Sequence, residues 1–414
     1  MKILNFGSCN IDYVYKLDHI VAVGETELSR SMSVFPGGKG LNQSIATARA
    51  GASVYHAGCI GAEGELLLDT MSESGVDLRY IKRVEEKNGH AIIQVSEKGE
   101  NSIFLYAGSN AMITEDFVDF VIGEFEKGDV IVLQNEINNM DYIINSAYKK
   151  GMTIVLNPSP IDEKIAGLDY NMISYVVLNE IEGEHISGQK VPEKIISVLK
   201  NKYPSLKVVL TLGDKGCMYY DGKDIYHHPA YEVEAVDTTA AGDTFMGYFV
   251  ACLVSGEESY KSIEKASLAS AIAVSRNGAA PSIPYCEEVE RARAVYKKKT
   301  DKTESREALI KAKIDAYIDE NIQSAALSGL AGELGYSSAY TGELVKKLTS
   351  KSFGNYLREK RCDAASRLLK STEMPIGDII RQVGYNNESF FRGIFAELYG
   401  TTPYNYRKTM KNRG

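Results

Sequence analysis

The chain is 414 residues long, with 44% hydrophobic residues, 25% charged residues and a formal net charge of −8 at pH 7. This length exceeds one average domain, and the ordinary apolar content is sufficient for a full core, so two or three packed domains are expected. No apolar run approaches the roughly 18 residues of a membrane span, and no signal peptide is evident, which predicts a cytoplasmic protein without a membrane partner. The six cysteines have no C-x-x-C spacing, so free thiols are expected rather than a zinc site.

The first 285 residues alternate short β-branched runs with amphipathic helical patterns. Strands are expected over 3–8, 54–59, 130–133, 153–156, 175–178 and 208–212, with helices between them, for example over 65–74 and 140–150. This alternation predicts an α/β fold with a parallel central sheet covered by helices on both faces. Ligands of such sheets bind beyond the carboxyl ends of the strands.

Two other segments have a different expected structure. Residues 90–96 and 102–107, joined by 97–101, predict a β-hairpin. His227 and His228 are expected in a turn, as a solvated pair without a metal-binding role.

A glycine cluster over residues 36–43 precedes a helical pattern that ends at Gly51. Glycines allow the backbone to approach a polar ligand closely, and Lys39 and Asn42 offer hydrogen-bond donors to sugar hydroxyls. The spacing differs from that of a P-loop, so the cluster predicts a different kind of ligand site.

Residues 236–245 are the most informative segment, because small residues precede an apolar run that predicts a helix. The unpaired N–H groups around Ala240, Ala241 and Gly242 would form an anion-binding site at the start of this helix. Asp243 falls in the first helical turn, where its carboxylate can accept a proton from an attacking hydroxyl.

Together, the two clusters resemble the paired signatures of the ribokinase (PfkB) family of sugar kinases, over roughly residues 1–295. The resemblance implies a ribokinase-like sandwich with a small β lid, to which the hairpin contributes. It also implies transfer of the γ-phosphoryl group of ATP to a primary hydroxyl, with O5 of D-ribose as the first candidate. Asp243 would be the base, and Ala240, Ala241 and Gly242 would supply the anion hole.

The resemblance further implies three sets of binding residues and a homodimer that pairs through its lids. The sugar would contact Asn10, Asp12, Gly38, Lys39, Asn42 and Glu136. ATP and Mg²⁺ would be held by Asn179, Glu182, Thr211, Gly213, Asp214, Gly216 and Ser267. Potassium would be held by Asp237, Thr239, Ala273, Arg276, Gly278 and Ser282, mostly through backbone carbonyls. Ser267 departs from the family, which often has a larger polar residue near the adenine.

Residues 291–307 are polar and rich in lysine, which predicts a domain boundary near residue 300. We expect a kinase domain over 1–297, a linker over 298–308 and an all-α domain over 309–414. Residues 301–414 carry 18 Lys and Arg against 14 Asp and Glu, a net charge of +4, so the first 300 residues carry −12. An acidic body with a basic tail is typical of an enzyme joined to a polyanion-binding module.

The C-terminal part contains an internal repeat. Leu334-Gly335-Tyr336 precedes an expected helix over 338–349, and Val383-Gly384-Tyr385 precedes another over 387–399. Each copy has the pattern of a helix-turn-helix unit, and a helix over 357–369 would link the two.

This tail resembles the AraC-type DNA-binding domain in Tyr356-Leu357-Arg358, Arg361, Ser389-Phe390-Phe391, Phe395 and the closing segment 400–407. The resemblance implies binding to double-stranded DNA, with the two units in successive major grooves about 34 Å apart. Expected phosphate partners are Lys346, Lys347, Lys351, Arg392 and Arg407. Glu343 and Gly393 depart from the family, whose recognition helices commonly have arginine there.

Three interpretations of the whole chain remain open. The first is an active sugar kinase joined to a transcription regulator. The second is a sugar sensor with slow turnover that acts only in transcription. The third is a kinase for another sugar or for a nucleoside.

Overall fold

The computed structural model describes residues 1–299 and 302–411, with side chains for 1–299 and 310–410. The chain divides into two compact units, Met1–Lys299 and Thr300–Gly414. Helix α11 (Lys302–Glu320) begins inside the predicted linker 298–308, of which residues 300–301 lie outside the described residues. The exact domain limits therefore stay a prediction.

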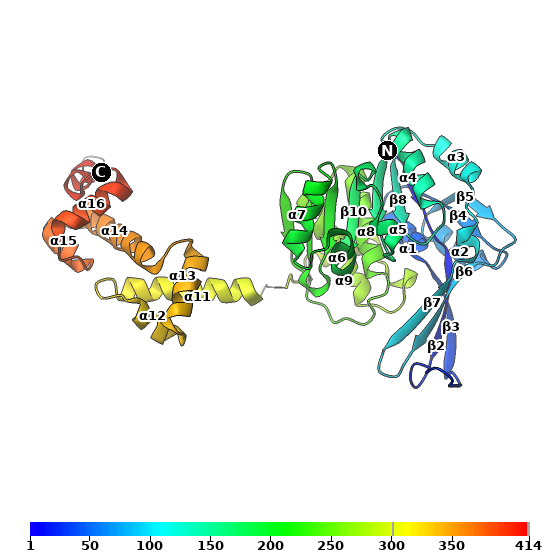
Figure 1. The fold of residues 1–414 in the computed structure, drawn as a ribbon, viewed down its shortest axis with the longest axis horizontal. Coiled ribbons are helices and arrows are strands. Elements are labelled where there is room, and N and C mark those ends of the chain that lie inside the picture. The colour runs from blue at the N-terminus through cyan, green and yellow to red at the C-terminus, as the bar shows by residue number, and fades with distance from the viewer. Residues whose placement is uncertain (300–301, 412–414) are drawn as a thin grey trace. The chain divides into compact units, whose positions relative to one another are not determined.

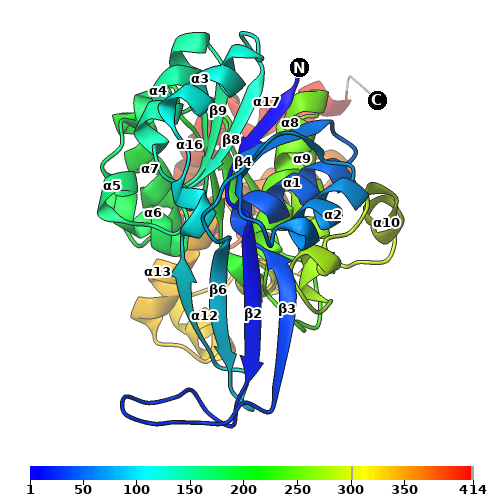
Figure 2. The same cartoon turned by 90° about the vertical axis from the view of Figure 1, so that its right-hand side faces the viewer.

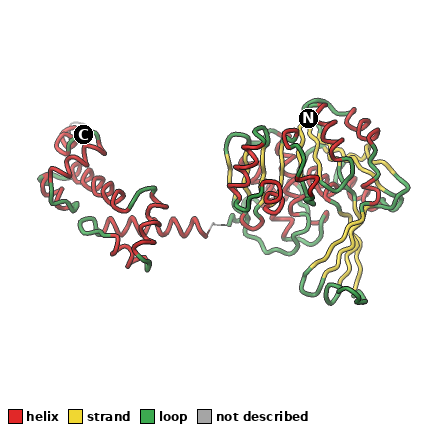
Figure 3. Tube along the Cα trace, in the orientation of Figure 1, coloured by secondary structure: helices red, strands yellow, loops and turns green. Residues whose placement is uncertain are grey.

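The first unit is built on a nine-stranded sheet in the order β13-β12-β11-β10-β9-β8-β1-β4-β5 (Figures 1 and 3). The strands are β1 (Ile3–Phe6), β4 (Val54–Ile60), β5 (Asp77–Arg83), β8 (Val130–Gln134), β9 (Thr153–Asn157), β10 (Tyr175–Asn179), β11 (Lys207–Thr211), β12 (Cys217–Tyr220) and β13 (Ile225–His228). Only the pairings of β11 with β12 and of β12 with β13 are antiparallel. All six predicted strands are confirmed and lie in this sheet.

Helices cover both faces of the sheet, and each face has its own apolar core. Along β8, Val130 and Val132 belong to one core, whereas Ile131 and Leu133 belong to the other, as the alternation of a strand requires. The first core includes α1 (Lys39–Arg49), α2 (Glu65–Glu73), α8 (Ala241–Ser255), α9 (Ser259–Val274) and α10 (Cys286–Ala292). The second includes α3 (Glu115–Gly123), α4 (Met140–Lys150), α5 (Glu163–Ala166) and α7 (Pro192–Lys202), with α6 (Glu180–Ser187) beside it. The predicted α/β architecture is confirmed.

A second, four-stranded sheet projects from the first unit (Figure 2). Its order is β3-β2-β6-β7, with β2 (Asn10–Lys16), β3 (Ser31–Gly37), β6 (Gly89–Val95) and β7 (Asn101–Tyr106). Strands β6 and β7 form the predicted hairpin, which is confirmed. Strands β2 and β3 were not predicted, and they double the width of this small sheet, which we call the lid.

The expectation that the histidine pair lies in a turn was wrong, and of the two residues only His227 is exposed as expected. His227 and His228 lie in β13, and the turn between β12 and β13 falls earlier, at residues 221–224. His228 is 1% exposed, and its ring lies in tilted contact with those of Tyr231 and, on α9, Tyr260.

The second unit is all-helical over the residues that the structure describes. Its helices after α11 are α12 (Leu327–Leu334), α13 (Ser338–Thr349), α14 (Phe353–Ser371), α15 (Ile376–Gln382), α16 (Glu388–Tyr399) and α17 (Pro403–Lys411). The two predicted helix-turn-helix units are α12–α13 and α15–α16, and the turns after their first helices contain Gly335 and Gly384 with φ of 72° and 87°. Leu357 and Leu369 join α14 to the separate apolar cores of the two units.

Among the described helices, none combines the length and the apolar content that crossing a bilayer would require.

Candidate active site

Asp243 lies in the first turn of α8, after Ala240, which adopts a left-handed conformation with φ of 59°. The side chain is 8% exposed, and α1 supplies both of its hydrogen-bond donors. Gln43 Nε2 donates to Asp243 Oδ1 over 2.9 Å, and Asn42 Nδ2 donates to Oδ2 over 3.1 Å. Two neutral amides therefore fix the carboxylate without neutralising its charge.

A chain of buried amides extends from this carboxylate to the centre of the sheet. Gln134 Nε2 donates to Gln43 Oε1 over 2.7 Å and to Asn5 Oδ1 over 3.0 Å. Gln43 Nε2 is also 3.2 Å from Asn157 Oδ1. Such a network restricts the rotamer of Gln43 and thus the position of Asp243. Gln43, Gln134 and Asn5 were missed in the sequence; the polar residues at the ends of apolar runs were the available signal.

The predicted sugar residues meet where the lid joins the large sheet, at the start of β2 and the end of β3. Glu136 Oε2 accepts hydrogen bonds from the backbone N–H of Lys39 over 2.9 Å and from Ser8 Oγ over 2.5 Å. Asn10 Oδ1 accepts from Asn110 Nδ2 over 2.7 Å. Asn110 is a further buried residue that the sequence did not reveal, and it holds the orientation of Asn10.

The carboxylates at this site influence one another. Burial, with the nearby charges of Glu136 and Asp243, raises the pKa of Asp12 to about 7, although Lys39 acts in the opposite direction. Burial alone would lower the pKa of Lys39, but the neighbouring carboxylates of Asp243, Glu136, Glu182 and Asp12 outweigh it and raise that pKa. Lys39 is therefore the cation at the centre of an acidic cluster.

Gly38 precedes α1 with φ of 91°, a conformation that favours glycine. An added Cβ there would lie 3.0 Å from the backbone nitrogen of Asn10. The glycine thus allows the start of α1 to approach the start of β2.

Asn179 and Glu182 form a capping box at the start of α6. Asn179 Oδ1 accepts from the Glu182 N–H over 2.9 Å, and Glu182 Oε2 accepts from the Asn179 N–H over 2.9 Å. Burial raises the pKa of Glu182, which is 4% exposed. The two residues thus stabilise the helix locally, and Glu182 also lies within the electrostatic range of Lys39.

A cavity of about 340 Å³ adjoins the start of α8. It is lined on one side by the predicted nucleotide residues Thr211, Gly213, Asp214, Gly216 and Ser267, and on another by Tyr231, Val233, Phe245, Ala271 and Val274. Thr238, Ala241 and Gly242 border the same cavity, and a Cβ added at Gly242 would meet no atom within 4 Å. The apolar wall suits a nucleobase, and the open helix start suits an anion.

The two predicted potassium loops meet at Asp237. Its Oδ1 accepts from the Thr239 N–H over 2.9 Å, and its Oδ2 accepts from the Gly278 N–H over 3.0 Å. Burial acts to raise the pKa of Asp237, but these hydrogen bonds outweigh it and lower the pKa.

The other members of the potassium set lie beside this junction. The Ala273 carbonyl accepts from the Arg276 N–H over 3.0 Å, and Arg276 pairs with Glu288 over 2.7 Å. Ser282 Oγ is buried and donates to the Ala279 carbonyl over 2.8 Å. Asp237 thus joins the two loops through hydrogen bonds, and potassium binding by these residues stays a prediction.

The predicted DNA residues differ in their surroundings. Lys346 and Lys347 are exposed on α13. Lys351 pairs with Glu359, and Arg392 pairs with Glu388 over 3.1 Å, so both retain exposed but partly compensated charges. Arg407 instead donates to the Met374 carbonyl over 2.8 Å and is half-buried, which gives it a structural role within the unit.

Comparison with known proteins agrees with this geometry. The pfkB family of carbohydrate kinases matches residues 1–286, and a helix-turn-helix domain family matches residues 330–409. Ribokinase of Staphylococcus aureus is 35% identical and covers 70% of this chain and 98% of its own length. Deoxyribokinase of Salmonella typhi is 27% identical, with coverages of 70% and 97%.

A solved structure of ribokinase from Cryptococcus neoformans, in complex with ADP, superposes with a TM-score of 0.63 and 32% identity. It covers 70% of this chain and 99% of its own. The chain thus belongs to the pfkB family of carbohydrate kinases, with a ribokinase-like fold followed by an AraC-type helix-turn-helix domain.

Proposed function

We propose that this carbohydrate kinase transfers the γ-phosphoryl group of ATP to O5 of D-ribose and that its C-terminal unit binds double-stranded DNA. The observation that carries the first part is the Asp243 carboxylate, held by Asn42 and Gln43 at a helix start that faces open space. The 35% identity to a ribokinase supports ribose as the acceptor. The relationship to a deoxyribokinase makes 2-deoxyribose the strongest alternative.

Asp243 accepts the proton of the sugar hydroxyl as that oxygen attacks phosphorus. The N–H groups of Ala240, Ala241 and Gly242 stabilise the charge that develops on the phosphoryl oxygens. Asn42 Oδ1 is buried and has no hydrogen-bond partner within the described residues, so it is available to accept from a sugar hydroxyl.

The remaining sugar contacts come from the acidic cluster. Asp12 and Glu136 accept hydrogen bonds from the ring hydroxyls, and the Asn10 amide can also donate to them. Gly38 allows the backbone to approach the sugar closely. Lys39 compensates their negative charge.

ATP occupies the cavity beside α8, with Thr211, Gly213, Asp214, Gly216 and Ser267 along one wall. Asn179 and Glu182 would orient Mg²⁺, which neutralises phosphate charge when bound. Bound K⁺ would stabilise the adjacent anion hole. It would be held by Asp237, Thr239, Ala273, Arg276, Gly278 and Ser282. We expect K⁺ to activate the enzyme by about tenfold over Na⁺ at equal ionic strength; equal rates in the two salts would reject the potassium site.

The lid provides the surface for a homodimer. Ile103, Phe104 and Leu105 on β7 are each more than half exposed, and Met32 on β3 is also half exposed. Apolar groups concentrated on a projecting sheet favour burial against a second copy. Light scattering should give a dimer for the intact chain and a monomer for Phe104→Glu, whereas a monomeric wild type would reject this part.

The proposed reaction is tested by measuring ADP release with D-ribose, 2-deoxyribose and a nucleoside panel at matched concentrations. We expect the highest kcat/KM with D-ribose. A higher value with another acceptor would change the substrate and leave the chemistry intact. Saturable sugar binding without ADP release would instead favour a sensor.

A further inference from the structure

The last described residue of the first unit, Lys299, lines the cavity that we assign to the nucleotide. Residues 297–299 pair with the strand-like segment 230–232: the Glu232 N–H donates to the Lys297 carbonyl over 2.8 Å, and the Lys299 N–H donates to the Ala230 carbonyl over 2.6 Å. Tyr231 and Lys298 are the bridge partners between these hydrogen bonds. We call residues 297–299 the exit strand, because the chain passes from it directly to the second unit.

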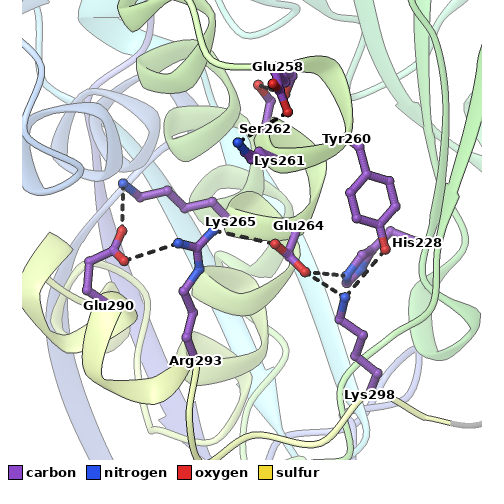
Figure 4. A network of polar contacts seen from close by, with 10 residues as sticks. All are labelled: His228, Glu258, Tyr260, Lys261, Ser262, Glu264, Lys265, Glu290, Arg293 and Lys298. Atoms are coloured by element: carbon purple, nitrogen blue, oxygen red, sulfur yellow. Dashed lines mark hydrogen bonds and ion pairs between the residues drawn. The ribbon is translucent and has the colours of Figure 1, made fainter.

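Side chains alternate along an extended strand, so neighbouring lysines of the exit strand have different surroundings. Lys298 points to α9, where its Nζ donates to Glu264 Oε1 over 2.6 Å and to the Tyr260 hydroxyl over 3.4 Å (Figure 4). Glu264 also pairs with Arg293 over 3.4 Å, and Arg293 with Glu290 over 3.3 Å. This network attaches the exit strand to the body of the unit.

Lys299, unlike Lys298, lines the cavity. Its Nζ donates to the Asp214 carbonyl over 3.3 Å and lies 3.7 Å from Asp214 Oδ2. Ala230 and Tyr231, the pairing partners of the exit strand, line the same cavity. A cation and a hydrogen-bonded strand edge thus border the space beside the Gly213–Gly216 loop.

We propose that Lys299 is a nucleotide-binding residue, and that a bound nucleoside triphosphate holds the exit strand in place at the point where the chain leaves for the DNA-binding unit. This inference rests on the proposed ATP-dependent function. The ammonium of Lys299 would attract the polyphosphate, and the bound nucleotide would cover the Ala230–Lys299 hydrogen bond from solvent. The pairing of the exit strand with residues 230–232 would then depend on nucleotide occupancy.

The test uses the intact chain and compares Lys299→Ala with Lys297→Ala. Lys297 is exposed on the same strand, and its side chain makes no hydrogen bond or ion pair within the described residues. Because Lys299 is partly exposed, we expect its replacement to raise the KM for ATP by about three- to tenfold. The kcat and the KM for the sugar should stay unchanged, and Lys297→Ala should match the wild type in all three constants.

Amide hydrogen exchange of residues 296–299 supplies the second measurement, with a non-hydrolysable ATP analogue and Mg²⁺ as the probe. Exchange should slow with the analogue in the wild type and in Lys297→Ala, and much less in Lys299→Ala. An unchanged KM for ATP in Lys299→Ala, or exchange indifferent to the analogue, would overturn this inference and leave the kinase assignment intact. A wild type that neither binds ATP nor releases ADP would overturn both.

Discussion

The two units hold their candidate functional residues in opposite ways. In the first unit, Asp243 is buried and fixed by donors from α1, which are fixed in turn by the sheet. In the second unit, Lys346 and Arg392 are exposed, and Arg392 is partly compensated by Glu388 on its own helix. Chemistry at one atom requires a preorganised site, whereas DNA binding is a sum of many phosphate contacts. Single substitutions should therefore have large effects in the first unit and small effects in the second.

The largest effect is expected from Asp243→Asn. This substitution keeps the shape and removes the proton acceptor, so kcat should fall by about 10³-fold or more. DNA affinity and the melting temperature should remain near those of the wild type. A kcat within about tenfold of the wild type would show that another group accepts the proton.

Gln43→Met should have the next largest effect. The replacement keeps a similar volume but removes the donor to Asp243 Oδ1, and kcat should fall by about 10- to 100-fold through misplacement of the base. The KM for ATP should change little. Gln382→Met, on the exposed surface of α15, is the matched control and should leave the kcat of the kinase reaction unchanged. An unchanged kcat for Gln43→Met would show that the amide network does not position Asp243 for catalysis.

These two residues also illustrate what the sequence could reveal. Asp243 lies in the first turn of a helix, as its local motif predicts, and α4 and α13 have the predicted limits because their periodicity is local. Gln43 was missed because its role depends on Asp243 and Gln134, which lie 200 and 91 positions away. Spacing along the chain contains no record of such contacts.

The strands predicted in the large sheet are mostly buried on both faces, whereas several missed strands are partly exposed. The buried runs of β8 and β10 consist almost entirely of apolar residues, which indicates a central strand. Strand β3 contains Pro36 and is mostly exposed, and β13 begins with exposed Ile225 and contains two histidines. Their pairing depends on partners in the sheet rather than on their own composition.

A smaller effect is expected from pH, through Asp12. Below its pKa of about 7 the carboxyl is protonated, and above it the carboxylate can accept two hydroxyl hydrogen bonds. The KM for the sugar should therefore fall as the pH rises, by up to about tenfold per unit below pH 7, and level off above it. In Asp12→Asn this dependence should disappear while the KM for ATP stays constant. A wild-type KM that is flat between pH 5.5 and 8 would contradict the raised pKa.

The smallest effects are expected in the second unit. Lys346→Ala and Arg392→Ala should each weaken binding to duplex DNA by about three- to tenfold and reduce the salt slope by about one. Arg407→Ala should mainly lower the free energy of unfolding, by about 1–3 kcal/mol, because its guanidinium bonds the Met374 carbonyl inside the unit. Fluorescence anisotropy over a salt series and thermal melting separate these outcomes. A loss of DNA affinity above about a hundredfold from Lys346→Ala alone would contradict the view that many phosphate contacts share the binding free energy.

The most direct test of the central claim is a crystal structure of the intact chain with D-ribose and a non-hydrolysable ATP analogue. Our account predicts a primary hydroxyl of the sugar within about 3.2 Å of an Asp243 carboxylate oxygen. It also predicts that Gln43 still donates to Oδ1 and that the γ-phosphate faces the N–H groups of Ala241 and Gly242. A sugar bound away from Asp243, or a carboxylate turned from the hydroxyl, would contradict it.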